Sequence, residues 1–383
     1  MTHIMHVPTK LVFGTGSINE LGKEARQLGK KVMVVTYPDI RRVGLLDKIM
    51  ADLKANKLKV LVFEKVQPNP RSSTVDEGAS LVRKEKVDLL IGLGGGSAMD
   101  SAKAIAVAST KDEPFWPRAL SGISESEVMD TIPSIIQVPT LAGTGSEMNN
   151  AVVITNWEAR EKRPITSSLM AAKVAIVDPE LTLTVPKKQT AQGGVDIFTH
   201  LAEPYVLLEK SAPVNDGIRE HLMRTVVKYL PQVLVKPDNI EARTQLSWVS
   251  TIAMCPLSAL GGGRYRGYHC HNIEHGVSAL YDVAHADGLA ALMPTFMRHI
   301  SPVRKERIET LGKNVFGTAD GIRATEGWLE SVGMKLRLRD LGCKLEDAEE
   351  VANIVLRTCP FSLEVSPLTI DAKQIAEMYR RAY

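Results

Sequence analysis

The sequence predicts a two-domain fold: an α/β, Rossmann-like domain with a parallel sheet over residues 1–186, then an all-helical domain over residues 187–383. In the first half, short apolar runs that do not alternate with polar residues are separated by helical segments, which is typical of a parallel sheet covered on both faces. Beyond Val185 and Pro186, helical periods replace these runs. The length of 383 residues and the hydrophobic content of 44% suffice for about two such cores.

The composition excludes several classes of function. Lys and Arg number 47 against 44 acidic residues, so a net charge of +3 gives no reason to expect nucleic acid or an anionic membrane as a partner. No apolar run reaches the roughly eighteen residues of a membrane span, and the N-terminal residues lack the pattern of a signal peptide. Four cysteines without a CxxC pair fit a reducing compartment. We therefore expect a cytoplasmic protein that acts on small molecules.

Expected strands and helices alternate through the first half. Residues 10–22 indicate a strand, a glycine turn and a helix with Ser17 or Asn19 near its N-cap. Apolar runs predict further strands at residues 31–36, 59–63, 87–93, 133–139 and 173–179. Helices are expected at residues 43–55, 73–85 and 98–108. Strands that are joined through helices indicate parallel pairing.

A glycine run from Gly94 to Gly96, followed by Ser97, joins the strand at residues 87–93 to the next helix. Glycines let backbone amides approach an anion, Ser97 can cap the helix, and a helix N-terminus carries partial positive charge. These features suit a diphosphate, although a plain tight turn would have a similar sequence. No GxGxxG motif is present, so the usual Rossmann fingerprint is absent.

Residues 140–150 form a second loop rich in glycine and hydroxyl side chains, after the strand at residues 133–139. Ligands of open α/β sheets bind beyond the carboxyl ends of the strands, so both loops are expected to face one ligand. The alternative is a turn that leads into the apolar run at residues 151–155, and the two interpretations are compatible.

The second half is expected to be helical and to contain a metal site. Five of the nine histidines fall in two segments of this half, residues 196–200 and 269–285. Asp196 lies four residues before His200, which places both on one helix face, and His271 and His275 repeat this spacing. His285 lies about four helical turns beyond His271, so it can return to the same side. Imidazoles with a carboxylate suit zinc or ferrous iron better than calcium or magnesium.

Two residues next to the histidines of the proposed site are not expected to bind the metal. Cys270 lies between two histidines and is interpreted as a packed thiol rather than a ligand. His269 is interpreted as an additional, exposed histidine. The remaining helical periods cover residues 189–208, 214–229, 239–259, 271–281, 288–299, 303–312, 321–332, 345–356 and 372–381.

Taken in order, these motifs resemble the iron-containing (group III) alcohol dehydrogenases, which share a dehydroquinate synthase-like superfold with glycerol dehydrogenase. The resemblance covers nearly the whole chain. It rests on residues 8–16, 94–106, 139–147 and 177–179 and on the Asp196, His200, His271, His275 and His285 pattern. Residues 68–71, 148–150 and 367–371 are most similar to the branch of butanol dehydrogenases and broad aldehyde reductases.

The resemblance implies a metal-dependent, NAD(P)-linked alcohol dehydrogenase or aldehyde reductase, with Fe2+ or Zn2+ in the helical domain. The implied metal ligands are Asp196, His200, His271 and His285. Gly95, Gly96, Ser97 and Asp100 would hold the pyrophosphate, Thr140 and Thr144 the nicotinamide end, and Lys162 a ribose hydroxyl. His275 would lie near the nicotinamide and the substrate oxygen and could pass a proton to solvent.

The segment after residues 31–36 departs from this branch, which usually has a glycine-rich turn there. Asp39 would accept the ribose hydroxyls and favour NAD, whereas Arg41 or Arg42 would pair with the extra phosphate of NADP. Of the two cofactors we expect NAD.

A short-chain primary alcohol or aldehyde is the expected substrate. The candidate pocket residues are Asn150, Phe198, Leu260 and Tyr265. A zinc polyol dehydrogenase or a dehydroquinate synthase-like lyase is the alternative, but the lyase would need more basic residues for its phosphorylated substrate. A non-catalytic nucleotide-binding protein is a more remote alternative. A homodimer or larger closed oligomer is expected on general grounds.

Overall fold

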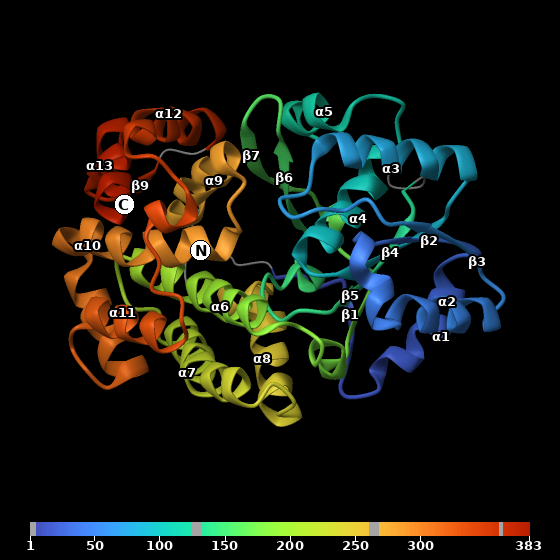
Figure 1. Cartoon of the computed structure of the whole chain (residues 1–383), viewed down its shortest axis with the longest axis horizontal. Helices are drawn as coiled ribbons and strands as arrows, with labels where there is room; N and C mark the ends of the chain where they lie inside the picture. The colour runs from blue at the N-terminus through green and yellow to red at the C-terminus, as the bar shows by residue number, and fades with distance from the viewer. Residues whose placement is uncertain (1–4, 124–131, 260–267, 360–362) are drawn as a thin grey trace. The chain divides into compact units, whose positions relative to one another are not determined.

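The chain forms two compact units (Figure 1). The computed structural model describes residues 5–123, 132–259, 268–359 and 363–383. The first unit comprises Met1–Trp157 and Pro164–Val185, and the second comprises Glu158–Arg163 and Pro186–Tyr383. None of the described helices combines the length and the hydropathy that a membrane span requires.

A six-stranded, fully parallel sheet lies at the centre of the first unit, in the order β1-β8-β5-β4-β2-β3. Its strands are β1 (Lys10–Phe13), β2 (Lys31–Val35), β3 (Lys59–Phe63), β4 (Leu89–Gly94), β5 (Ser134–Pro139) and β8 (Val174–Val177). In the central strand, Ile91 is in register with Val34 of β2 and with Ile136 of β5. The predicted parallel sheet is confirmed, because non-alternating apolar runs are buried on both faces.

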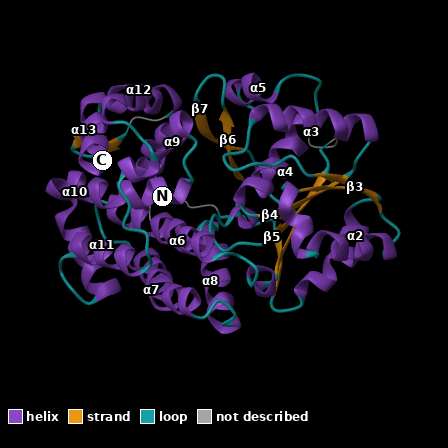
Figure 2. Ribbon diagram, viewed as in Figure 1, coloured by secondary structure: helices purple, strands orange, loops and turns teal. Residues whose placement is uncertain are grey.

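Helices cover both faces of this sheet (Figure 2). Val32 and Val34 pack in one core with α1 and α2, whereas Met33 and Val35 pack in a second core with α3, α4 and α5. These helices are α1 (Leu21–Leu28), α2 (Leu45–Ala55), α3 (Ser72–Glu85), α4 (Gly96–Ala108) and α5 (Phe115–Ser121). Full burial of each such side chain contributes roughly 1.5–3 kcal/mol, so both helical layers stabilise the sheet.

A β-hairpin and several short 3-10 helices complete the first half of the chain. β6 (Ala151–Asn156) pairs with β7 (Glu161–Thr166), and this pairing was not predicted. The hairpin tip, Glu158–Arg163, is the part that belongs to the second unit. The 3-10 helices are η1 (Ser17–Glu20), η2 (Pro38–Val43), η3 (Ser146–Met148), η4 (Ser168–Met170) and η5 (Pro179–Thr182).

The second unit is predominantly helical, as predicted. Its long helices are α6 (Lys187–Leu207), α7 (Pro213–Val235), α8 (Ile240–Ala253), α9 (His269–Tyr281), α10 (His285–Leu311), α11 (Gly321–Ser331), α12 (Ala348–Thr358) and α13 (Ala372–Ala382). Two expected helices, at residues 288–299 and 303–312, form the single kinked α10, with non-helical backbone at Arg304. A short antiparallel pair, β9 (Glu364–Val365) and β10 (Leu368–Thr369), lies between α12 and α13.

The sequence predicts the helix ends only in part. α4 begins at Gly96 with Gly95 as its N-cap, so Ser97 lies inside the first turn and does not cap the helix. Ser17 and Asn19 do not cap α1 either, because a 3-10 turn precedes that helix. α9 ends at Tyr281, as predicted, before a left-handed residue, and the next helix, α10, begins at His285, three residues before its expected start at residue 288.

Gly312 and Gly327 in the helical unit have different surroundings, so substitution by alanine is expected to have opposite effects on stability at the two positions. A Cβ at Gly312 would lie 2.4 Å from the carbonyl oxygen of Thr318 and 2.7 Å from the amide nitrogen of Gly321. A Cβ at Gly327, within α11, would meet nothing within 4 Å.

We expect Gly312→Ala to lower the stability of the helical unit by about 1–3 kcal/mol, because the added methyl group meets backbone that cannot move aside cheaply. Gly327→Ala is the matched control and should raise stability by up to about 1 kcal/mol through helix propensity. Thermal unfolding of both variants measures the difference. Equal melting temperatures would show that the close backbone contact at Gly312 is not present.

Candidate functional site

One face of α6 carries a stripe of buried polar side chains. Asp196, His200 and Glu203 follow one another at spacings of four and three residues, which stacks them along a single helix face. Pro204 follows immediately and cannot donate a backbone hydrogen bond to the His200 carbonyl. Arg219 of α7 supplies that bond instead, with its Nη1 3.2 Å from the His200 oxygen. The stripe thus lies in a helix in which Arg219 replaces the backbone hydrogen bond that Pro204 cannot make.

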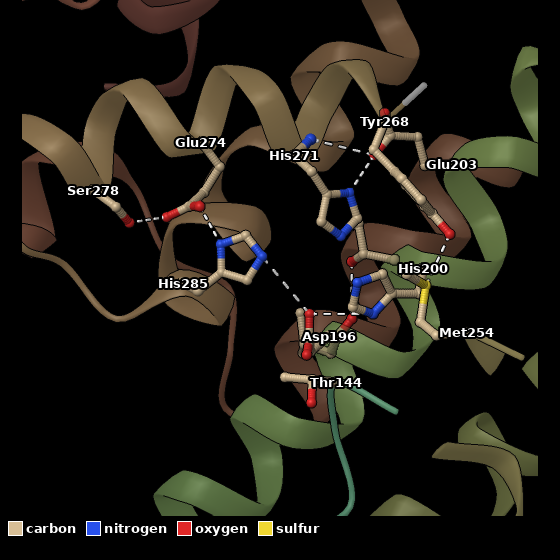
Figure 3. A network of polar contacts seen from close by, with 12 residues as sticks. Thr144, Asp196, His200, Glu203, Met254, Tyr268, His271, Glu274, Ser278 and His285 are labelled. Atoms are coloured by element: carbon tan, nitrogen blue, oxygen red, sulfur yellow. Dashed lines mark hydrogen bonds and ion pairs between the residues drawn. The ribbon is translucent and has the colours of Figure 1, made fainter. Parts of the chain in front are cut away.

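The predicted metal ligands lie together around this stripe (Figure 3). Nδ1 of His200 is 3.4 Å from Oδ1 of Asp196, and Nε2 of His285 is 3.9 Å from the same oxygen. The rings of His200 and His271 stack with centroids 4.5 Å apart. Asp196, His200 and His271 offer ligand atoms within 4.8 Å of one another. α6, the first turn of α9 and the first residue of α10 therefore deliver a carboxylate and three imidazoles to one place.

The chemistry of this cluster fits a divalent cation. Within the described part of the chain, Nδ1 of His200 and Nε2 of His271 are buried without a hydrogen-bond partner. Leaving such an atom unsatisfied costs about 1–3 kcal/mol, which a bound cation would offset. Burial lowers the pKa of His200 to about 4 and that of His271 to about 3, so both imidazoles are in the neutral form that binds metal at pH 7.

Glu203 is a functional residue that the sequence analysis missed. Its Oε2 lies 2.5 Å from Nδ1 of His271, and its carboxylate also accepts the backbone amides of Cys270, at 2.6 Å, and His271, at 3.3 Å. It therefore caps the N-terminus of α9 from another helix, where the N-cap residue Tyr268 makes no side-chain cap bond. Burial raises the pKa of Glu203 to about 7. The sequence signal was its position on the Asp196 and His200 face.

Glu274 is the second missed residue. It lies fully buried in α9, where its carboxylate accepts hydrogen bonds from Nδ1 of His285 and Oγ of Ser278. Nζ of Lys162, at the hairpin tip, is 3.5 Å from Oε2 of Glu274. The sequence signal that could have identified Glu274 is its position between His271 and His285, two expected metal ligands.

The other residues of the histidine segment are also buried. His275 lies near His285, with ring centroids 5.4 Å apart, and burial together with Lys162 holds its pKa well below the usual range. Cys270 is a packed thiol, as expected, and burial raises its pKa well above the ordinary value. The expectation that His269 is exposed is wrong: it is 2% exposed, and its Nε2 lies 3.0 Å from the Glu364 carbonyl oxygen.

In the first unit, the two glycine-rich loops pack directly against each other. A Cβ at Gly96 would lie 2.4 Å from Cγ2 of Thr144, so only glycine allows this approach. The Thr140 amide donates to the carbonyl oxygen of Gly94, whose φ of +146° is accessible to glycine. The structure therefore groups Gly95, Gly96 and the N-terminus of α4 with Thr140 and Thr144.

Asp100 and Lys103, one turn apart in α4, form hydrogen bonds with the second glycine-rich loop and the residues that follow it. Asp100 accepts the Ser146 hydroxyl at 2.6 Å and the Val153 amide at 2.8 Å. The fully buried ammonium of Lys103 donates to the carbonyl oxygens of Ser146 and Asn149, at 2.5 and 2.9 Å. Burial lowers the pKa of Lys103 to about 8. Sequence reasoning missed Lys103 because its partners lie more than 40 positions away.

Charged residues follow β2, where Asp39 was singled out. Asp39 pairs with Arg42 at 3.2 Å, and both side chains are exposed. Arg41 makes a two-pronged contact with Glu64, at 2.7 and 2.9 Å. Arg41 is therefore already paired with a carboxylate.

The candidate pocket residues lie in different surroundings. Phe198 is buried against Trp328, with ring centroids 4.5 Å apart, which makes it a core residue of the helical unit. Asn150 is exposed in the second glycine-rich loop. Leu260 and Tyr265 fall outside the described residues.

Comparison with known proteins gives matches along the chain. Residues 8–179 match the family model described as iron-containing alcohol dehydrogenase, and residues 190–383 match the model for the C-terminal part of that family. NADH-dependent butanol dehydrogenase A of Clostridium acetobutylicum is 35% identical, with 98% of each chain covered. The NADPH-dependent aldehyde reductase YqhD of Escherichia coli is 29% identical over 88% of each chain. The crystal structure of NADH-dependent butanol dehydrogenase A from Thermotoga maritima superposes with a TM-score of 0.93 at 33% identity, covering 100% of this chain and 98% of the other.

The lowered pKa values lead to a test on metal-free protein. We expect His200 and His271 to stay neutral at pH 5.5, since a lowered pKa means that protons bind only at a lower pH, near 4 and 3. NMR titration of 13C-labelled imidazoles measures this, with His200→Ala and His271→Ala assigning the signals. Midpoints near the ordinary value of 6.5 would contradict the buried, neutral site.

Proposed function

The chain belongs to the iron-containing alcohol dehydrogenase family, and we propose from this that it is an NAD(P)-dependent alcohol dehydrogenase and aldehyde reductase. The observation that carries the proposal is the buried group of Asp196, His200 and His271 in the helical unit, with Nε2 of the partly exposed His285 3.9 Å from Oδ1 of Asp196. The reaction is hydride transfer between a nicotinamide and an alcohol or aldehyde carbon, with the nicotinamide as the redox group.

We propose Asp196, His200, His271 and His285 as the ligands of a divalent metal, either Fe2+ or Zn2+. A bound cation with an open coordination position would polarise the substrate oxygen as a Lewis acid. The protein contributes neutral imidazoles, a buried carboxylate and the orientation of His271 by Glu203. Imidazole and carboxylate ligands serve both metals, so availability would decide between them.

The first unit is proposed to bind the nucleotide. Gly95, Gly96 and Ser97 form the N-terminus of α4, where free amides and the helix dipole would stabilise a pyrophosphate. Thr140 and Thr144 are proposed for the nicotinamide end. Both oxygens of Asp100 bond to the protein itself, so we propose that it contributes by shaping the second loop.

Asp39 is proposed to favour NAD over NADP. It follows β2 directly, and its carboxylate would accept ribose hydroxyls and repel a 2′-phosphate. The pairing of Arg41 with Glu64 supports the same preference, because this guanidinium already faces a carboxylate.

Lys162 and His275 are proposed to serve the reacting end of the cofactor. Lys162 would donate to a ribose hydroxyl while its ammonium stays next to Glu274. His275 lies next to His285, with ring centroids 5.4 Å apart, and is proposed to relay to solvent the proton that an alcohol loses.

A short-chain primary alcohol or aldehyde is the proposed substrate class. This proposal draws on the similarity to butanol dehydrogenases, for which 35% identity extends over 98% of both chains. Assembly as a homodimer or larger oligomer and a cytoplasmic location stay predictions from the sequence.

Removal of metal tests the proposed site. We expect chelator-treated enzyme to lose at least about 100-fold in NADH-dependent reduction of butyraldehyde, because metal stabilisation of transition-state charge contributes several kcal/mol. Fe2+ or Zn2+ should restore turnover in the wild type but not in His271→Ala. NADH binding, followed by fluorescence, is the control and should persist in both proteins. Undiminished turnover without metal would contradict the proposal.

Replacement of Asp39 tests cofactor preference. We expect Asp39→Gly to raise the NADPH to NADH ratio of kcat/KM about tenfold, which corresponds to the loss of about 1.4 kcal/mol of discrimination. Asp47→Asn is the matched control, since it removes a nearby exposed carboxylate that lies 3.7 Å from Arg41. An equal shift in both variants would show that only the local charge matters, and no shift would rule out Asp39 as the discriminating group.

A further inference from the structure

Glu274 is a fully buried acid whose carboxylate has three polar partners, Ser278, His285 and Lys162. One carboxylate oxygen accepts from Ser278, one turn along α9. The other faces two groups, Nδ1 of His285 and the ammonium of Lys162. Because a lone buried carboxylate is strongly unfavourable, these partners define its position and its charge.

The bond to His285 determines which ring nitrogen remains available. With Nδ1 held by Glu274, only Nε2 is left, and Nε2 lies 3.9 Å from Oδ1 of Asp196. His285 is the first residue of α10, so it lacks a preceding helical turn that would restrict its ring. A carboxylate on the second imidazole nitrogen is the usual way in which proteins fix the tautomer and direction of a metal-binding histidine.

Space for this carboxylate is built into the neighbouring helix. Gly288 lies three residues after His285 on α10, and a Cβ there would come within 2.8 Å of Cγ and 2.9 Å of Oε1 of Glu274. Any larger residue at this position would displace Glu274 from His285. The glycine, the acid and the histidine therefore form one packed arrangement.

Lys162 supplies the countercharge, and its side chain is 4% exposed. It belongs to the hairpin tip, which other contacts fasten to the helical unit: Arg160 pairs with Glu350 at 3.2 Å, and Glu161 pairs with Arg357 at 3.1 Å. Its distance of 3.5 Å from Glu274 allows an ion pair but is longer than a strong charge-assisted hydrogen bond.

We propose that Glu274 is a positioning residue that directs Nε2 of His285 to the metal, and that Lys162 weakens metal binding by drawing on the same carboxylate. This inference rests on the proposed metal site. It assigns opposite effects to the two partners of one buried ion pair. Loss of Glu274 removes the hydrogen bond that holds Nδ1 of His285, whereas loss of Lys162 removes the positive charge that competes with His285 for the same carboxylate oxygen.

The test is Co2+ binding to metal-stripped protein, measured by chelator competition and by the visible absorption of the bound ion. We expect Glu274→Gln to weaken Co2+ binding about 10–100-fold and to change the absorption spectrum, as is typical when the partner of a metal-binding histidine is lost. Lys162→Met should bind Co2+ more tightly than the wild type, because the competing positive charge is gone. Ser278→Ala, which removes the remaining donor to Glu274, is the matched control and should change the affinity less than about threefold.

The outcomes separate this inference from the proposed function. Wild-type protein that binds no Co2+ would overturn the metal site itself. Wild-type binding with an unchanged affinity and spectrum in Glu274→Gln would overturn only the role of Glu274. Equal or weaker binding in Lys162→Met would overturn the opposing role of Lys162. Circular dichroism and thermal unfolding show whether each variant is folded, and Glu274→Asp provides a second variant that keeps the charge but cannot reach His285 equally well.

Discussion

The helical unit depends on the burial of three polar side chains along one face of α6. Unsatisfied, a buried carboxylate costs several kcal/mol, which is a large part of the 5–15 kcal/mol by which domains are stable. The surrounding helices therefore place polar groups next to these side chains. A backbone amide at the N-terminus of α9 donates to Glu203, and the imidazole of His285, the first residue of α10, lies 3.9 Å from Asp196. The arrangement that satisfies α6 is also the one that brings the proposed metal ligands together, so the same contacts serve stability and the proposed chemistry.

Much of the fold could be predicted from local patterns. Non-alternating apolar runs identified the parallel strands, because a strand that is buried on both faces needs no polar residues. The spacing of Asp196 and His200 and the density of later histidines predicted residues that the structure brings together, since these signals lie within a few residues of one another. Helix ends were less predictable: glycine in place of a capping side chain began α4, so Ser97 had no capping role.

The missed residues have a shared physical reason. Glu203, Glu274 and Lys103 act through partners that the fold brings from 11 to 112 positions away. Periodicity and composition carry no information about such contacts, and a buried acid looks like an exposed one in the sequence. Only the packed structure shows that His269 is buried.

The hairpin tip has a consequence for dividing the protein into fragments. The chain leaves the first unit at Trp157, contributes six residues to the second, and returns at Pro164 before the final crossing at Val185. A fragment that starts at Pro186 would therefore contain Glu274, Glu350 and Arg357 but not the tip residues with which they pair. The two compact units are thus not two separable pieces of sequence, and gene fusions or truncations designed at residue 185 would expose a buried acid in the helical unit.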